Sequence, residues 1–178
     1  GIRDYKVTGV QTCALPICGT ADSTTVLYGD STYKTLPSGG ATNVWIPASA
    51  FIPRTTNGAG VDSVETTTNT QNFDQLTFDP ATAQFADALV IMPSNYNAGT
   101  VTARFYWTAS SGSGGCVWRL SGLAFGDNGT LDTATGTAQS VTDTLLSANV
   151  MHVSNATSAI TISGTPAANK PEIGRVHV

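Results

Sequence analysis

The chain has 178 residues, of which 8 are Lys or Arg and 12 are Asp or Glu, so its formal net charge at pH 7 is −4. Sparse, acidic charge argues against a nucleic-acid partner, which needs a stripe of basic residues to neutralise phosphates. No apolar run approaches the roughly 20 residues that a membrane-spanning helix needs, so we expect no membrane partner either. The length fits about one domain.

The first residues do not have the character of a protein sequence. Residues 1–17 resemble one reading frame of a DNA sequencing adapter: residues 7–17 correspond to its constant primer segment, Tyr5 and Lys6 fall where the sample index sits, and residues 1–4 correspond to the upstream arm. Segments of this kind are excluded from fold reasoning, as tags and fusion scars are.

The other end of the chain resembles an adapter as well. Residues 173–178 differ at one position from the complementary adapter read outward, which has Ala where Val176 stands. We therefore expect residues 1–18 to be adapter-derived and to lie outside the folded core, and residues 172–178 to be an adapter-derived tail. The natural segment is then a fragment cut at both ends.

Excluding these segments reduces the number of cysteines that belong to the natural protein. Cys13 lies in the adapter-like segment and Cys18 at its junction, which leaves Cys116 as the one cysteine that is securely natural. The sequence therefore predicts neither a disulfide framework nor a Cys/His metal site.

The remaining composition favours strands. Thr, Ser, Gly, Asn and Ala are abundant, β-branched residues are common, and strong helix formers such as Glu and Lys are scarce. A core is supplied by aromatic residues, namely Trp45, Phe73, Phe78, Phe85, Phe105, Trp107, Trp118 and Phe125. The composition predicts an all-β domain.

Turn residues divide the chain into short elements. Residues 19–40 predict an irregular leader or fibre connector, because Gly, Asp, Ser and Pro interrupt it too often for a long element. Residues 55–72 are polar and contain a turn signal at Asn57-Gly58. In chain order, we expect strands at residues 43–46, 73–78, 84–92, 100–108, 116–125, 139–146, 150–154 and 159–163, and one helical turn within residues 48–53. Residues 81–89 taken alone would also suit a short helix.

Residues 100–108 alternate between apolar and polar side chains. Val101, Phe105 and Trp107 share one face with Ala103, whereas Thr102 and Arg104 lie on the other. Such alternation predicts a half-buried strand.

We therefore expect Val101, Phe105, Trp107 and Trp118 to be mostly buried and Thr102 and Arg104 to be more exposed. The Gly/Ser-rich loop at residues 110–115 predicts a hairpin between this strand and residues 116–125.

Strands that recur at roughly 8–12 residue intervals with turn signals between them predict an antiparallel β-sandwich, jelly-roll-like in arrangement. We expect this incomplete domain to span residues 41–171.

The sequence contains none of the common catalytic or nucleotide-binding motifs, so we predict no catalytic, cofactor-binding or metal-binding residues, no cofactor, and no enzymatic activity. His152, the only plausible natural histidine, is expected to face solvent or to pack beside its strand neighbours. Asp127, Asn128 and Asp132 offer oxygens to Ca²⁺, but they lack EF-hand spacing, and Asx-Gly turns explain them.

Two further patterns were considered. A glycosidase needs two acids across a cleft, and Asp74, Asp79, Asp87, Asp127 and Asp132 show no spacing that singles out a pair. A sugar-stacking platform needs exposed, coplanar aromatic rings. The candidates for such rings are Trp45, Tyr96, Tyr106, Trp107 and Trp118. Trp107 lies on the apolar face of its predicted strand and is assigned to the core instead.

The segment from residue 26 to 168 resembles a family of tailed-phage virion proteins, tail-fibre or capsid-associated, from environmental phages. Residues 26–37 are similar to a short fibre connector in which Tyr28, Ser31 and Tyr33 replace Arg, Gly and Trp. Further similar stretches are residues 44–48, 53–58, 64–69, 99–102, 117–118, 132–139 and 160–168. The resemblance implies a β-sandwich without catalytic residues that continues past residue 168 with further strands.

We therefore expect a non-enzymatic structural protein of a virion, with other virion proteins and further copies of itself as partners and a host-surface glycan as another partner to consider. The alternative is a carbohydrate-binding β-sandwich module. A continuous apolar flank would favour assembly, whereas coplanar exposed aromatics would favour glycan binding. Loss of the later strands predicts an unpaired sheet edge.

Overall fold

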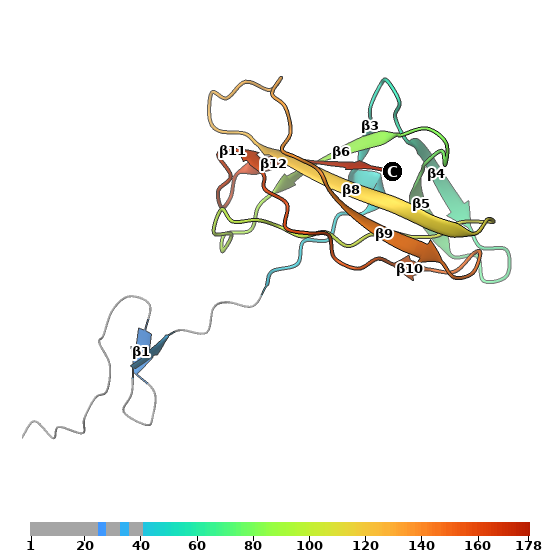
Figure 1. Cartoon of the computed structure of the whole chain (residues 1–178), viewed down its shortest axis with the longest axis horizontal. Coiled ribbons are helices and arrows are strands. Elements are labelled where there is room, and N and C mark those ends of the chain that lie inside the picture. The colour runs from blue at the N-terminus through green and yellow to red at the C-terminus, as the bar shows by residue number, and fades with distance from the viewer. Residues whose placement is uncertain (1–24, 28–32, 36–40) are drawn as a thin grey trace, which may run out of the picture. The chain divides into compact units, whose positions relative to one another are not determined.

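The computed structural model describes residues 25–27, 33–35 and 41–178 (Figure 1). The chain divides into two compact units, residues 1–42 and 43–178. In the first unit, β1 (Thr25–Leu27) pairs with β2 (Tyr33–Thr35) in antiparallel fashion, so the leader predicted at residues 19–40 contains two very short strands. The prediction for residues 1–18 falls outside the described residues.

The second unit confirms the predicted all-β class. Within the described residues of this unit, the regular elements are strands apart from one 3-10 turn, η1 (Ala48–Ala50), which is the helical turn expected there. The main sheet has six strands in the order β11-β8-β12-β6-β3, with β9 also paired to β8. These strands are β3 (Ile52–Pro53), β6 (Phe85–Ile91), β8 (Gly114–Ala124), β9 (Gln139–Leu145), β11 (Ser163–Gly164) and β12 (Pro171–His177).

The longest strand, β8, organises the main sheet. Its first part pairs with β9 from Gly114 to Leu120, and its last part pairs with β12 from Arg119 to Ala124. The predicted hairpin between residues 100–108 and 116–125 is therefore wrong. The Gly/Ser-rich loop carries the chain away from β7 (Tyr106–Trp107), which pairs with β10 (His152–Val153) instead.

The strand β12 lies in the middle of the sheet, paired with β6 on one side and β8 on the other (Figure 1). The sequence placed the end of the domain at residue 171, so the structure corrects this boundary: residues 172–177 belong to the sheet. This pairing is made by backbone N–H and C=O groups, so it does not require an alternating apolar sequence. The adapter origin of residues 172–178 remains a prediction.

A second layer is formed by an irregular ribbon between residues 101–109 and 149–160. Backbone N–H groups of Ser154, Thr157 and Ile160 donate to the carbonyls of Phe105, Ala103 and Val101, respectively. In the return direction, the hydroxyls of Ser154 and Thr157 accept hydrogen bonds from the N–H groups of Phe105 and Ala103 at 2.9 and 3.1 Å. These hydroxyls replace backbone carbonyls, so the predicted nine-residue strand shortens to β7.

The core lies between this ribbon and the main sheet, in a sandwich-like arrangement. Ala59, Ala86 and Val176 form one buried cluster, and Ala124, Ile160 and Ile162 form another. The rings of Phe105 and Trp118 stack across the two layers at 5.2 Å between centroids, with an interplanar angle of 15°.

The alternation predicted for residues 101–108 is confirmed. Val101, Phe105 and Trp107 are half-buried, whereas Thr102 and Arg104 are exposed. Trp118 is half-buried too, so these apolar side chains face the interior without being fully enclosed.

Two regions differ from the sequence predictions. Residues 43–46 form no strand, and residues 55–72 contain β4 (Gly60–Glu65), which pairs with β5 (Asn72–Thr77) as a separate hairpin. In β4, Val61 and Val64 lie on opposite faces and are 67% and 38% exposed. Because both faces carry polar and apolar residues, the strand lacks the alternation by which a half-buried strand is recognised.

Candidate functional site

His152 is buried, with a relative exposure of 5%, and packs against Trp107 at 4.8 Å between ring centroids. Its Nε2 accepts a hydrogen bond from the Leu146 N–H at 2.9 Å, so the ring proton lies on Nδ1, which donates to the Val150 carbonyl at 3.0 Å. Both nitrogens are thus engaged by backbone groups. The prediction that His152 packs beside its strand neighbours is confirmed, and its bonds give it a structural role.

The carboxylates that sequence analysis considered are dispersed. Asp74 accepts a hydrogen bond from Ser63, Asp79 accepts one from the Ala81 N–H, and Asp87 pairs with Arg175. Within the described residues, no group of three or more His, Cys, Asp or Glu side chains is placed to hold a metal ion. Asp74, Asp79 and Asp87 therefore each bind a separate partner in the part of the chain that the structure describes.

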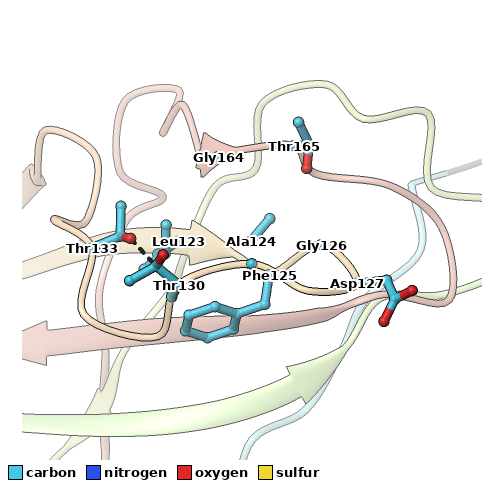
Figure 2. Close-up of a pocket in the computed structure, with 10 residues that line it drawn as sticks. Leu123, Ala124, Phe125, Gly126, Asp127, Thr130, Thr133, Gly164 and Thr165 are labelled. Carbon is cyan, nitrogen blue, oxygen red and sulfur yellow. Dashed lines mark hydrogen bonds between the residues drawn. The ribbon is translucent and has the colours of Figure 1, made fainter.

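The loop after β8 encloses a shallow pocket of about 300 Å³, whose ten lining residues are drawn in Figure 2. Asp127 is exposed, and Asn128 adopts a positive φ of 59° within a turn closed by the bond from the Gly129 N–H to the Gly126 carbonyl. The hydroxyl of Thr133 donates to the Thr130 carbonyl. The positive φ of Asn128 and the backbone bond account for this segment as a turn, as the sequence predicted.

Cys116 and the histidine of β12 are held in environments that disfavour their charged forms. Burial raises the pKa of the Cys116 thiol, and the nearby Asp143 carboxylate raises it further, which disfavours a reactive thiolate. Burial lowers the pKa of His177, and the charges of Arg119 and Arg175 act in the same direction.

Glu172, in contrast, places an ionisable carboxyl on the inner face of the main sheet. It is 4% exposed, and its Oε1 is buried without a hydrogen-bond partner. Burial raises the pKa of this carboxyl to about 6. A buried carboxylate that lacks a partner destabilises the fold.

The aromatic residues do not form a coplanar platform. Trp107 and Trp118 are half-buried, and Tyr96 is half-buried with its hydroxyl donating to the Gly99 carbonyl at 2.6 Å. Trp45 and Tyr106 remain exposed, at 66% and 51%, and meet edge to face with 74° between their planes. Together with Val153, the strand partner of Tyr106, they form a small surface that we call the aromatic face.

A second group of exposed apolar side chains lies on the outer side of the main sheet, over β3 and β6, beside the Asp87–Arg175 ion pair. Ile52, Leu89 and Ile91 are 74%, 63% and 59% exposed. Ile52 is opposite Asp87, and Leu89 and Ile91 follow Asp87 at two-residue intervals, so all of them project from the same side. We call Ile52, Leu89 and Ile91 the outer β6 face.

The outer β6 face was not among the features predicted from the sequence. The signal was present, because β6 carries Leu89, Val90 and Ile91 in succession, which places apolar side chains on both sides of the strand. Such a run is typical of a strand covered on both faces. Only the inner side, with Ala86 and Ala88 at 0% and 1% exposure, is covered in the structure.

Comparisons with known proteins found no match among family models, curated proteins or solved structures. Among the described residues, no helix has the length and apolar character required to cross a membrane.

Proposed function

We propose that this chain is a non-enzymatic structural component of a tailed-phage virion, a jelly-roll-like module of a tail fibre or capsid-associated appendage that assembles in several copies. The outer β6 face carries this proposal, because it exposes three large apolar side chains on the solvent side of the main sheet. Exposed apolar patches of this kind mark sites of association between proteins. The resemblance of residues 26–168 to phage virion proteins supplies the biological setting.

The occupant of the outer β6 face in this proposal is a second copy of the chain. Replacing Leu89 and Ile91 together by Ser should shift the sedimentation of the protein toward smaller species without lowering its melting temperature, since both side chains of a single copy project into solvent. The matched control replaces Leu131 and Leu146, which are 78% and 86% exposed and lie outside the strands. A sedimentation distribution that the β6 substitutions leave unchanged would contradict this role of the face.

The virion setting has an independent test in the source genome. Assembly of the sequencing reads around the coding segment for residues 19–171 should yield a contig that also encodes portal, tail and lysis proteins. A contig of bacterial polysaccharide-degrading genes would contradict the proposal and favour the carbohydrate-binding alternative.

The aromatic face supports that alternative as a second candidate, because an exposed Trp and Tyr in contact are able to stack on a sugar ring. We expect glycan binding, if it occurs, to be abolished by Trp45→Ala and retained in Leu131→Ala, as measured by affinity electrophoresis in polysaccharide gels. The edge-to-face angle between the rings does not provide the flat platform of parallel rings that an extended glycan requires, so the assembly function is the better supported.

A further inference from the structure

In the main sheet, β12 fills the position between β6 and β8. β12 makes seven register pairs with β6 and six with β8. Without it, the facing edges of β6 and β8 would have unpaired N–H and C=O groups, which are a template for any extended chain. The space between β6 and β8, which we call the β12 groove, is therefore a strand-binding site.

The walls of the groove and its occupant come from distant parts of the sequence. In the 178-residue chain, residues 165–170 join β12 to β11, and the partners of β12 lie at residues 85–91 and 119–124. A second copy of the chain presents the same groove with the same partners. A strand that moves into the groove of a neighbouring copy therefore regains every pair that it leaves, as in domain swapping.

The fit of β12 is uneven, which favours its release. The pairing directs Glu172 to the inner face beside Ala124 and Val90, where its Oε1 has no partner. When β12 leaves the groove, this carboxylate regains water. At the other end of the strand, Arg175 holds Asp87 through two hydrogen bonds of 2.7 and 3.0 Å, and this contact re-forms in any groove that carries Asp87.

We propose that the β12 groove accepts β12 from a second copy of this chain, so that copies are linked by exchange of this strand. The choice of a second copy as partner rests on the proposed function, in which the chain assembles in several copies. The groove is built by β6 and β8, from the segment that resembles phage proteins, whereas β12 includes most of the adapter-like tail. A groove completed by such a tail recognises extended backbone more than it recognises one sequence.

The experiment uses cysteine pairs that join β12 to β6. The Met92 N–H donates to the Lys170 carbonyl at 3.1 Å, and the alternation of antiparallel pairing then makes Leu89 and Ile173 a non-hydrogen-bonded pair on the outer face. Their Cα atoms are about 4.5 Å apart in such a pair, which a disulfide can bridge.

Two versions of the full chain are prepared with Cys13, Cys18 and Cys116 replaced by Ser. One carries Leu89→Cys and is ¹⁵N-labelled, and the other carries Ile173→Cys. They are mixed at high concentration, oxidised and digested, and mass spectrometry identifies the linked peptides. We expect a 89–173 link between labelled and unlabelled chains, at least tenfold more abundant than the 131–173 link in a matched mixture that carries Leu131→Cys in place of Leu89→Cys.

Equal amounts of the two links would overturn the proposal, because random collision would then account for both. A second measurement follows the rate of exchange. Glu172→Leu in both copies should slow formation of the 89–173 link at least tenfold at pH 7.5, since β12 then leaves an apolar site; an unchanged rate would overturn the proposed role of Glu172. A chain carrying Leu89→Cys and Ile173→Cys together should form an internal disulfide when oxidised at low concentration and 89–173 linked dimers after incubation at high concentration; the absence of an 89–173 disulfide under both conditions would contradict the pairing.

The outcome is separable from that of the proposed function. Phage genes around the coding segment together with no 89–173 link would leave the virion proposal standing and remove strand exchange. An 89–173 link in the protein, together with a contig that carries no phage genes, would support strand exchange and contradict the virion proposal.

Discussion

The neighbouring strands β8 and β12 share a ladder of backbone pairs but differ in how their side chains suit the interior. The inner positions of β8 carry no charged residue: they are Cys116, Trp118, Leu120, Gly122 and Ala124. Those of β12 are Glu172, Gly174 and Val176. Backbone pairing on both edges therefore holds a strand in the middle of a sheet even where one of its side chains does not fit the interior.

The register of β12 is a compromise that its sequence explains. In the observed register, Val176 joins Ala59 and Ala86 in the core at 4% exposure, and Glu172 is the one charged residue turned inward. A slip by one residue would turn Ile173 inward together with Arg175 and His177, because every side chain changes face. One buried carboxyl near the start of the strand is less unfavourable than two basic side chains in the core.

The largest effect should come from the well-fitted strand. Trp118 of β8 stacks on Phe105 and meets Phe78 edge to face at 5.6 Å. We expect Trp118→Ala to lower the free energy of unfolding by about 3–5 kcal/mol, as for other buried large-to-small changes of aromatic residues. Chemical denaturation measures this loss, and Trp45→Ala, at an exposed Trp, is the control. Comparable losses in the two variants would mean that Trp118 does not anchor the core.

The poorly fitted strand should respond in the opposite direction. Glu172→Leu removes a buried carboxylate that lacks a partner for Oε1, so we expect it to raise the free energy of unfolding at pH 7.5 by about 1–3 kcal/mol. Denaturant titration measures the gain. Glu65→Leu, at an exposed position of β4, is the matched control and should change stability by less than about 0.5 kcal/mol. A loss of stability in Glu172→Leu would show that the carboxylate has a favourable role in its site.

The pH dependence of stability sharpens the same point. The pKa of Glu172 is raised from 4.5 to about 6 in the folded protein, so its contribution is complete below about pH 4.5 and is lost as the pH rises through about 6. The stability of Glu172→Gln minus that of the unsubstituted chain should therefore increase by about 1–2 kcal/mol between pH 4 and pH 7.

The difference between the two chains is the quantity to measure, because His177 acts in the opposite direction. Its pKa is lowered in the folded protein, so its stabilising contribution is present above the ordinary value of 6.5 and is lost as the pH falls. This contribution is common to both chains and cancels. A difference that stays constant from pH 4 to pH 7 would exclude Glu172 as the titrating group.

Sequence analysis succeeded where burial on one side determines the pattern. The alternation from Val101 to Trp107 correctly separated the inner from the exposed side chains, although Ser154 and Thr157 replaced part of the expected strand pairing. Pairing partners could not be predicted in this way, because alternation identifies the face of a strand and not its neighbour. The hairpin expected around residues 110–115 was wrong for that reason.

Some features of the candidate sites were predictable from the sequence and others were not. The dispersal of the acidic residues and the core position of Trp107 followed from pattern and spacing. The outer β6 face did not, because whether Leu89 and Ile91 are covered depends on which other segments pack against that side of the sheet. The central position of β12 was likewise beyond a reading of local sequence, since its seven pairs with β6 join residues far apart in the chain.

The smallest expected effect concerns the side-chain ion pair between β12 and β6. Arg175 and Asp87 form a bidentate pair on the outer face, with side chains 31% and 20% exposed. Partial exposure screens the charges, whereas the two parallel bonds add geometric specificity. A double-mutant cycle of Arg175→Met and Asp87→Asn should therefore give a coupling of about 1 kcal/mol at low salt, and less at 1 M NaCl. Arg119→Met combined with Asp87→Asn is the control cycle, because Arg119 has no bond to Asp87. A coupling no larger than in the control would mean that backbone pairing and Val176 alone hold β12 in its register. The β12 groove would then accept strands that have no Arg at the position of Arg175.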